Sequence, residues 1–241
     1  MFQINERVSI VVPTYNERDN ILPLCEGIRL ALEPVWDYEV IIVDDNSPDG
    51  TQEIVLDMAE LDPKVTLLPR PGKLGLGSAI VAGFEIATGD YWVMMDADLS
   101  HRPQDIPRLL HALSEADIVV GSRYVPGGAV ANWPLRRKIV SVCASALGRL
   151  IVGLQVRDLT SGFGAFRRSN LESLLPSLNP RGFKLLLEIL AKSGNSRVKE
   201  APITFIERQH GHSKASATEA LLFLRLCFEL RGHRRKQDKG R

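Results

Sequence analysis

The sequence predicts an α/β fold in which a mostly parallel sheet is flanked by helices. Two observations lead to this prediction. Short apolar runs rich in Val and Ile alternate, along the first half of the chain, with stretches of helical period. Strand–helix alternation of this kind is typical of doubly wound sheets. The 241 residues, of which 44% are hydrophobic and 24% charged, suffice for one large globular domain.

Four apolar runs have the composition of buried parallel strands, which lack a polar face because helices cover both sides of the sheet. Each run is bounded by Pro, Gly or Asp. The predicted strands span residues 8–12, 39–43, 91–95 and 117–120.

The segments between these strands carry apolar residues at helical spacing. The first predicted helix begins near Asn16 or Glu17, and Thr51 is a favourable N-cap for the second. Gly89 ends the third, and Pro103 opens the fourth. The apolar stripes span residues 21–32, 54–61, 80–87 and 106–113.

Charge and cysteine content argue against several function classes. The net charge is +1, so a uniformly basic nucleic-acid binder is disfavoured, and we expect no nucleic-acid partner. The three cysteines, Cys25, Cys143 and Cys227, are scattered among apolar residues. This pattern favours reduced core residues of a cytoplasmic protein over a zinc site. The chain lacks a signal-peptide pattern and any apolar stretch of about 18 residues that could span a bilayer.

Polar residues follow each predicted strand, where ligands bind in open α/β sheets. These segments are residues 13–17, 44–50, 96–98 and 121–124. Residues 44–50 also have good turn chemistry. Three of the segments nevertheless bring carboxylates to one rim, where a cation or a ligand's donors must neutralise them.

Asp96 and Asp98 are two residues apart, so in an extended segment they point the same way. Paired carboxylates suit Mg²⁺ or Mn²⁺ bound to a diphosphate. The glycine-rich segment 71–77 opens a helix but lacks the spacing of a nucleotide P-loop. It either cradles a phosphate or lets the helix pack closely on the sheet.

These motifs, in this order, resemble the inverting glycosyltransferases of family 2, which have the Rossmann-like GT-A fold. Motifs in the second half are similar to those of the dolichol-phosphate (polyprenol-phosphate) mannose synthases. The matching segments are 8–17, 43–51, 73–77, 95–101, 121–124, 133–141, 158–163 and 208–214.

The resemblance implies a role for individual residues on the donor side. Asp98 is implied as the main metal ligand and, with Arg123, as catalytic. Ser100 stands near the metal, where some relatives have Gln. Gly164 stands where relatives have a large or basic residue. The implied nucleotide-sugar site contains Pro13, Tyr15, Glu17, Val43, Asp45, Asp96, Ala97, Asp98, Arg123, Arg208 and Lys214, and the implied metal site Asp96, Asp98 and Ser100.

On the acceptor side, the resemblance implies that Arg123, Arg137 and Ser141 hold a phosphate. The implied reaction moves mannose from GDP-mannose to dolichyl or polyprenyl phosphate in one metal-dependent displacement. A phosphate acceptor needs no general base, because its second pKa is near 6. Alternatives are another donor such as UDP-glucose, a hydroxyl acceptor, or a non-catalytic nucleotide-sugar-binding subunit.

A polyprenyl acceptor implies a membrane surface. We expect a catalytic domain over residues 1–215, then an amphipathic helix and basic tail over 216–241, which includes a net charge of +5 after residue 230. Segments 136–154 and 216–231 either pack on the catalytic core or lie at the interface. The tail is either a solvated end or a contact for anionic lipid. We expect peripheral association with the cytoplasmic membrane face, through these helices or a membrane-anchoring partner subunit.

Overall fold

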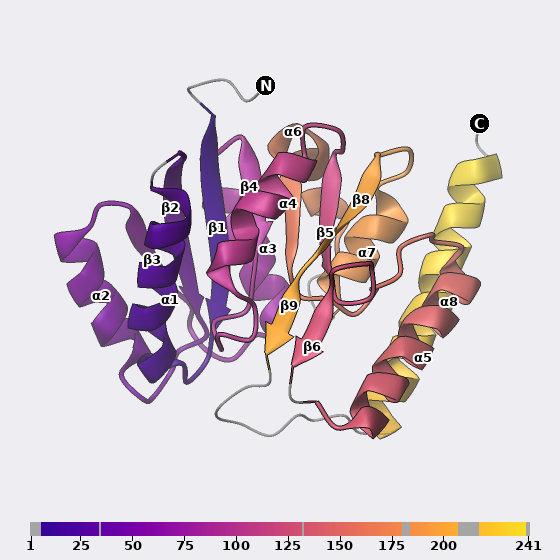
Figure 1. The fold of residues 1–241 in the computed structure, drawn as a ribbon, viewed down its shortest axis with the longest axis horizontal. Helices are drawn as coiled ribbons and strands as arrows, with labels where there is room; N and C mark the ends of the chain where they lie inside the picture. The colour runs from indigo at the N-terminus through magenta and orange to yellow at the C-terminus, as the bar shows by residue number, and fades with distance from the viewer. Residues whose placement is uncertain (1–5, 34, 132, 180–183, 207–216, 240–241) are drawn as a thin grey trace.

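The structure, a computed structural model, describes residues 6–33, 35–131, 133–179, 184–206 and 217–239. A seven-stranded sheet with the order β3-β2-β1-β4-β7-β5-β8 runs through its centre (Figure 1). All neighbouring strands are parallel except β7, which is antiparallel to both β4 and β5. The predicted α/β class with a mostly parallel sheet is therefore confirmed.

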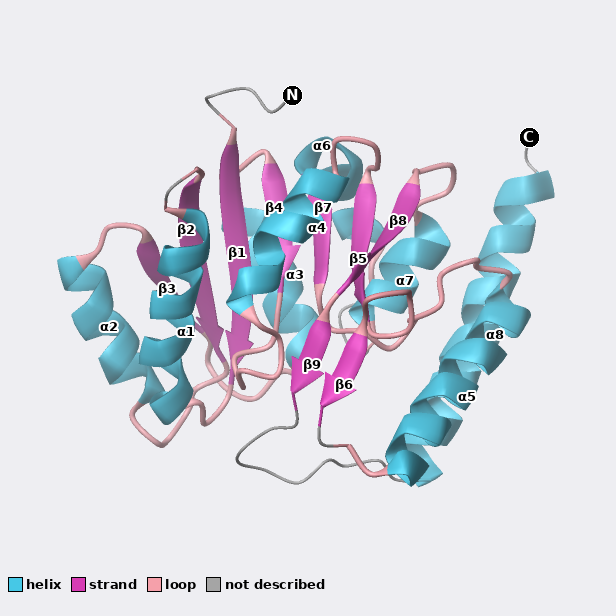
Figure 2. Cartoon of the chain, viewed as in Figure 1, coloured by secondary structure: helices cyan, strands magenta, loops and turns pink. Residues whose placement is uncertain are grey.

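The four predicted strands form β1, β2, β4 and β5, and three further strands complete the sheet. The strands are β1 (Arg7–Thr14), β2 (Asp37–Asp44), β3 (Val65–Pro69), β4 (Tyr91–Met94), β5 (Ile118–Ser122), β7 (Gly164–Arg167) and β8 (Val198–Pro202). A separate parallel ribbon, β6 (Ala129–Ala131) with β9 (Thr204–Ile206), continues from the lower ends of β5 and β8 in Figure 2.

Helices cover both faces of the sheet (Figure 2). The four predicted helices correspond to α1, α2, α3 and the helix pair η1 and α4. The bounds are α1 (Arg18–Leu32), α2 (Thr51–Leu61), α3 (Leu76–Ile86), η1 (Pro103–Asp105), α4 (Ile106–Ala112), α5 (Leu135–Val152), α6 (Arg168–Leu171), η2 (Glu172–Ser177), α7 (Leu185–Lys192) and α8 (Ala217–Lys239).

The core is divided by the sheet into two clusters. The first lies under α1, α2 and α4, and the second under α3, α5, α7 and α8. Helix α3 approaches the sheet closely at Gly83, where an added Cβ would lie 2.3 Å from Val11 Cγ1 and 3.0 Å from Val43 Cγ2. A glycine is needed at this position because the backbone of α3 occupies the space of a side chain.

A buried carboxylate joins three segments at the amino-terminal end of the sheet. Glu39 Oε1 accepts hydrogen bonds from Ser9 Oγ at 2.6 Å and from the backbone N and Oγ1 of Thr88, both at 2.8 Å. Burial pushes the pKa of Glu39 up, but these hydrogen bonds hold it below its ordinary value. This network fixes the end of the sheet opposite the predicted site.

Helices α5 and α8 lie side by side at one end of the sheet and run in the same direction (Figure 1). Gly148 of α5 makes room for α8, since an added Cβ would lie 3.0 Å from Phe223 Cζ and 3.6 Å from Cys227 Sγ. Phe223, Cys227 and Leu230 are buried in the second core cluster. This face of α8 therefore packs on the second core cluster, as in one of the two alternatives expected from the sequence.

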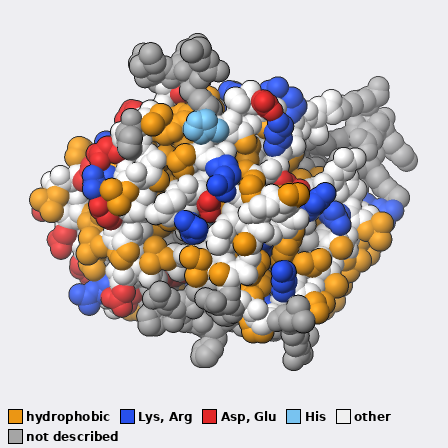
Figure 3. Space-filling view, viewed as in Figure 1, with side chains coloured by type: hydrophobic (Ala, Val, Ile, Leu, Met, Phe, Trp, Pro, Cys, Tyr) orange, Lys and Arg blue, Asp and Glu red, His pale blue; other side chains and the backbone are white. Residues whose placement is uncertain are grey.

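The opposite face of the α5–α8 pair is exposed and largely apolar, although α8 also exposes the Arg225–Glu229 ion pair there. We call this surface the apolar face; Figure 3 shows its hydrophobic side chains along the lower right edge, over α5. It consists of Ile139, Val140, Val142, Leu147, Leu150, Leu221, Leu222 and Phe228. Among the described residues, no helix is long and apolar enough to cross a membrane. Helix α8 extends to Lys239 and so includes most of the basic segment.

Candidate active site

Three strands end at one rim of the sheet and bring the predicted site residues together. The pairing of Thr14 with Asp44 aligns the ends of β1 and β2, and Val11 pairs with Met94 of β4. Asp45 N–H donates to Thr14 O at 3.0 Å, so the segments that follow β1 and β2 stay adjacent. The segments with Tyr15, Asp45, Asp96 and Asp98 are thus neighbours, as the sequence predicts.

Asp45 fixes the glycine-rich segment against this rim. Its Oδ1 is 2.8 Å from Arg70 Nη1, and its Oδ2 accepts the Gly75 N–H at 2.8 Å. Both members of this ion pair are almost fully buried. Lys73, in the same segment, places Nζ 3.7 Å from the centroid of the Tyr15 ring. The segment is therefore held beside Asp45 and Tyr15 at the rim, and Arg70 is a contributor that the sequence did not reveal.

Several implied pocket residues face the core rather than the rim. The side chains of Pro13, Val43 and Ala97 are buried, and Val43 and Ala97 belong to the core clusters. Their contribution to a nucleotide site would come from the backbone. Glu17 is half-buried at the start of α1 and accepts a hydrogen bond from Asn20 Nδ2 at 2.6 Å.

Asp98 is oriented by Ser100. The backbone N and the Oγ of Ser100 both donate to Asp98 Oδ1, at 3.0 and 2.5 Å, and Leu99 between them has a left-handed φ of 60°. Ser100 is buried, so its hydroxyl is committed to Asp98. Ser100 therefore holds the carboxylate that the family resemblance implies as the main metal ligand.

Asp96 is supported by His101. Its backbone N–H donates to His101 Nδ1 at 3.2 Å, and the His101 ring packs against Phe163 and Phe205 at 5.1 and 5.3 Å between centroids. Because Nδ1 accepts, the neutral ring has its proton on Nε2. A side chain at position 162 would crowd the Asp96 carboxylate, because a Cβ added to Gly162 would lie 3.1 Å from Asp96 Oδ2.

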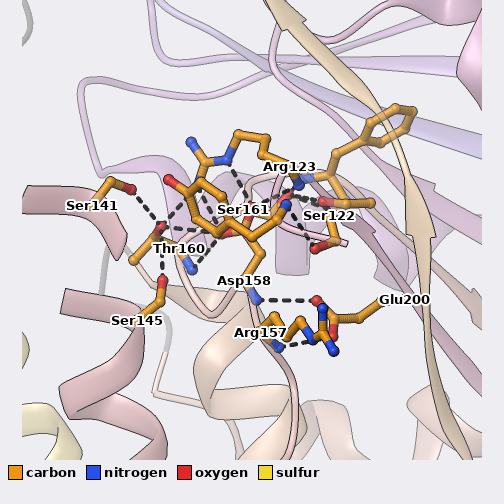
Figure 4. A network of polar contacts seen from close by, with 12 residues as sticks. Ser122, Arg123, Ser141, Ser145, Arg157, Asp158, Thr160, Ser161 and Glu200 are labelled. Atoms are coloured by element: carbon orange, nitrogen blue, oxygen red, sulfur yellow. Dashed lines mark hydrogen bonds and ion pairs between the residues drawn. The ribbon is translucent and has the colours of Figure 1, made fainter. Parts of the chain in front are cut away.

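Arg123 is held by a buried ion pair (Figure 4). Its Nε and Nη2 donate to the two carboxylate oxygens of Asp158, each at 2.7 Å, and its backbone N donates to Oδ2 at 3.1 Å. Burial works to lower the pKa of Arg123, but the hydrogen bonds and charge of Asp158 raise it above its ordinary value. The guanidinium is therefore a permanent, fixed cation at the end of β5.

Thr160 joins this ion pair to helix α5 (Figure 4). Arg123 Nη2 donates to Thr160 Oγ1 at 2.8 Å, and Thr160 Oγ1 lies 3.3 Å from Ser141 Oγ and 3.5 Å from Ser145 Oγ. Ser141 and Ser145 are one turn apart on the same face of α5. The predicted acceptor residues Arg123 and Ser141 are thus connected through one hydroxyl.

Arg137 joins the same cluster through Trp133. Its Cζ lies 4.1 Å from the centroid of the Trp133 ring, and Arg123 Cζ lies 5.4 Å from the same ring. Trp133 packs in turn on Phe205 of β9, with 5.3 Å between ring centroids. Of the three implied acceptor-phosphate residues, Arg123 is thus linked to Ser141 through Thr160 and to Arg137 through the Trp133 ring.

Two implied donor residues, Arg208 and Lys214, lie outside the described residues. Asp158, Thr160 and Trp133 were present in the recognised motifs, but no role was assigned to them from the sequence. The expected departure at Gly164 has a structural reason. An added Cβ there would lie 3.0 Å from Phe166 Cζ and 3.4 Å from Val119 O, so a larger residue would require the Phe166 ring to shift.

Comparison with known proteins identifies the family. The family model described as glycosyl transferase family 2 matches residues 9–175. The chain belongs to glycosyltransferase family 2. It is 43% identical, over 93% of its length, to the dolichol-phosphate mannosyltransferase of Pyrococcus furiosus, and it spans 63% of that relative. It is also 43% identical to the undecaprenyl-phosphate mannosyltransferase of Micrococcus luteus, with 87% of this chain and 88% of the relative covered.

Solved structures confirm the GT-A fold of this family 2 enzyme. Glucosyl-3-phosphoglycerate synthase from Mycobacterium tuberculosis, solved with Mn²⁺, UDP and phosphoglyceric acid, aligns with a TM-score of 0.72 at 19% identity over 95% of this chain and 79% of that one. A mannosyltransferase from Pyrobaculum calidifontis, solved with GDP-Man and Mn²⁺, aligns with a TM-score of 0.62 at 22% identity over 86% and 58% of the two chains.

Proposed function

We propose that this glycosyltransferase moves mannose from GDP-mannose to the phosphate of a polyprenyl or dolichyl phosphate. The observation that supports this most is the cluster of Arg123, Arg137 and Ser141, which offers two cations and a hydroxyl to a phosphate beside the carboxylates of the rim. Relatives named for mannosyl transfer to dolichol phosphate and undecaprenyl phosphate support the same acceptor class.

The donor set fits a divalent cation. Asp96 is partly exposed at the rim, and Asp98 is oriented by two hydrogen bonds from Ser100. The described residues contain no group of three or more His, Cys, Asp or Glu side chains suited to a metal. Two carboxylates leave coordination positions for diphosphate oxygens, which is how Mg²⁺ or Mn²⁺ binds nucleotide substrates. When bound, the cation would neutralise charge on the leaving diphosphate.

The protein's own residues then position the two substrates for a single displacement. An oxygen of the acceptor phosphate forms the new bond to the anomeric carbon while the bond to GDP breaks, and the electron pair of that bond goes to the diphosphate. The acceptor is already a nucleophile at neutral pH, because its second pKa is near 6. Arg123, fixed by Asp158, supplies positive charge where both phosphates meet. The configuration at the anomeric carbon is inverted.

The apolar face supports a membrane location for the acceptor. Arg137 and Ser141 lie near the start of α5, and Ile139, Val140 and Val142 of the same helix are exposed. An amphipathic helix of this kind lies in the interfacial plane with its apolar side buried in lipid. We infer peripheral association with the cytoplasmic membrane face, to which an anchoring partner subunit would add.

A transfer assay tests the proposed reaction. The protein is incubated with labelled GDP-mannose, GDP-glucose, UDP-glucose and UDP-galactose, each with Mg²⁺ or Mn²⁺ and a polyprenyl phosphate. Label is expected in the lipid phase from GDP-mannose, and not after EDTA treatment. The matching polyprenyl alcohol is the control acceptor. Equal transfer to the alcohol would contradict the base-free mechanism, and preferential use of another donor would contradict the assignment of the sugar nucleotide.

Arg137 provides a test of the acceptor site. Arg137→Ala is expected to raise the acceptor KM roughly tenfold, the cost of one charge-assisted hydrogen bond to a phosphate. GDP-mannose affinity in calorimetry should stay close to that of the wild type. Lys138→Ala, which removes an exposed cation from the adjacent position, is the matched control. An equal rise in KM for both variants would show that only the general charge of the helix matters.

Liposome flotation tests the membrane location. Leu221→Ser with Leu222→Ser removes two exposed side chains of α8 and is expected to weaken flotation at every salt concentration. Leu56→Ser with Leu61→Ser makes the same change at exposed positions of α2 and should leave flotation intact. Equal effects of the two pairs would contradict a specific membrane role for the apolar face.

A further inference from the structure

Thr160 lies between the catalytic arginine and the helix that bears the acceptor residues (Figure 4). Its side chain is half-buried and its Oγ1 has four polar neighbours. These are Arg123 Nη2 at 2.8 Å, Asp158 Oδ1 at 3.2 Å, Ser141 Oγ at 3.3 Å and Ser145 Oγ at 3.5 Å.

The direction of each hydrogen bond follows from the number of protons available. A guanidinium nitrogen only donates, so Thr160 Oγ1 accepts from Arg123. The Asp158 carboxylate, paired with Arg123, only accepts, so the single Thr160 proton goes to Asp158. One lone pair of Thr160 remains, and a serine of α5 donates to it; Ser145 is that donor when Ser141 gives its single proton to a bound phosphate. Ser141 is the nearer of the two.

This arrangement couples two parts of the site that come from different elements. Arg123 follows β5, whereas Ser141 belongs to α5, and Thr160 hydrogen-bonds to both. A phosphate that contacts the guanidinium and the hydroxyl together requires a fixed spacing between them. Small displacements of positioned groups lower reaction rates strongly, because the reacting atoms must be aligned within fractions of an ångström.

We propose that Thr160 is a positioning residue for the acceptor phosphate, and that its hydroxyl sets the Arg123 guanidinium and the Ser141 hydroxyl relative to each other. This inference rests on the proposed function. Thr160 touches neither reacting atom in this scheme; it acts through Arg123 and Ser141. Without its hydroxyl, Arg123 Nη2 loses one of its two hydrogen bonds, and Ser141 loses its link to the ion pair.

Paired substitutions test the hydroxyl separately from the shape of the side chain. Thr160→Val keeps the shape and removes the hydroxyl, whereas Thr160→Ser keeps the hydroxyl and removes the methyl group. Thr160→Val is expected to raise the KM for polyprenyl phosphate roughly tenfold, as for loss of a hydrogen bond to a charged group. GDP-mannose affinity should change less than about twofold, and Thr160→Ser should restore most of the acceptor affinity.

The control is Thr66→Val, the same change at an exposed position of β3. Circular dichroism and thermal melting check that each variant folds; Thr160→Ala replaces Thr160→Val, under the same criteria, if the valine variant does not. An unchanged acceptor KM, equal losses in the valine and serine variants, or an equal loss of donor affinity would overturn the inference. Failure of the wild type to transfer mannose to polyprenyl phosphate would instead refute the proposed function.

Discussion

Breaking the ion pair between Arg123 and Asp158 is expected to lower stability strongly, because it would leave one buried charge without its partner. Its side chains are 5% and 0% exposed, and Asp158 accepts five hydrogen bonds from Arg123 and Thr160. Removing one member of a buried pair leaves an uncompensated charge and typically costs about 3–5 kcal/mol. We therefore expect Asp158→Asn to lower the free energy of unfolding by about 3–5 kcal/mol, a large fraction of a typical domain's stability.

The chain contains a matched control for this measurement. Arg197 binds Asp117 through the same three donors, with Nε, Nη2 and the backbone N at 3.3, 2.9 and 2.8 Å from the carboxylate. The side chains of this second pair are 63% and 14% exposed, so water screens their attraction. Asp117→Asn should therefore lower stability far less than Asp158→Asn.

Urea denaturation, monitored by circular dichroism, gives the free energy of unfolding of both variants. The slope of this free energy with urea concentration shows whether unfolding stays two-state. A double variant, Arg123→Met with Asp158→Leu, should lose less stability than the sum of the single changes, because no unpaired charge remains buried. Equal losses for Asp158→Asn and Asp117→Asn would refute the argument that burial decides the cost of breaking the pair.

Three further changes probe the metal site, the packing of α3 and the far end of the sheet. Asp98→Asn should abolish the tightening of GDP-mannose binding by Mn²⁺ in calorimetry, since the ligand charge is lost. Gly83→Ala should lower the melting temperature because its Cβ would overlap Val11, at a cost of about 1–3 kcal/mol. Gly232→Ala, a change in α8 with open space around it, should raise the melting temperature. Glu39→Gln should flatten the pH dependence of acid unfolding, because the lowered pKa of Glu39 stabilises the wild type at pH values above the usual carboxyl range, and that contribution is lost as pH falls from this range through the lowered pKa.

The parts of the fold that could be predicted are those whose local sequence decides their structure. Strands β1, β2, β4 and β5 are buried apolar runs, and their helices have regular apolar stripes. Strand β7 has the sequence GAFR and is antiparallel, inserted between β4 and β5. Strand β8, VKEAP, contains two charged residues and a proline. Pairing with a neighbouring strand, rather than local preference, makes these two segments extended.

The residues of the candidate site also divide into those whose position could be predicted from the sequence and those whose position could not. Asp96, Asp98 and Arg123 follow predicted strands, so their position at the rim could be inferred from the chain order. The partner of Arg123 could not, because Asp158 is 35 residues away and lies in a loop without periodicity. Arg70 likewise reaches Asp45 only through the packing of β3 beside β2. Long-range ion pairs between loops depend on the folded backbone, which no local pattern specifies.

Helices α5 and α8 show how one pair of helices can serve both ends of an amphipathic acceptor. Phe223 and Cys227 fix α8 against Gly148 of α5, so the pair is attached to the catalytic core. The side of α5 that faces the core contains Ser141 and Ser145, which meet Thr160 and thereby Arg123. Its other side is exposed and apolar. A lipid phosphate requires both surfaces, since its head must reach fixed cations while its tail stays in the bilayer. A soluble acceptor would make no use of the second surface, and for that reason the apolar face favours the lipid.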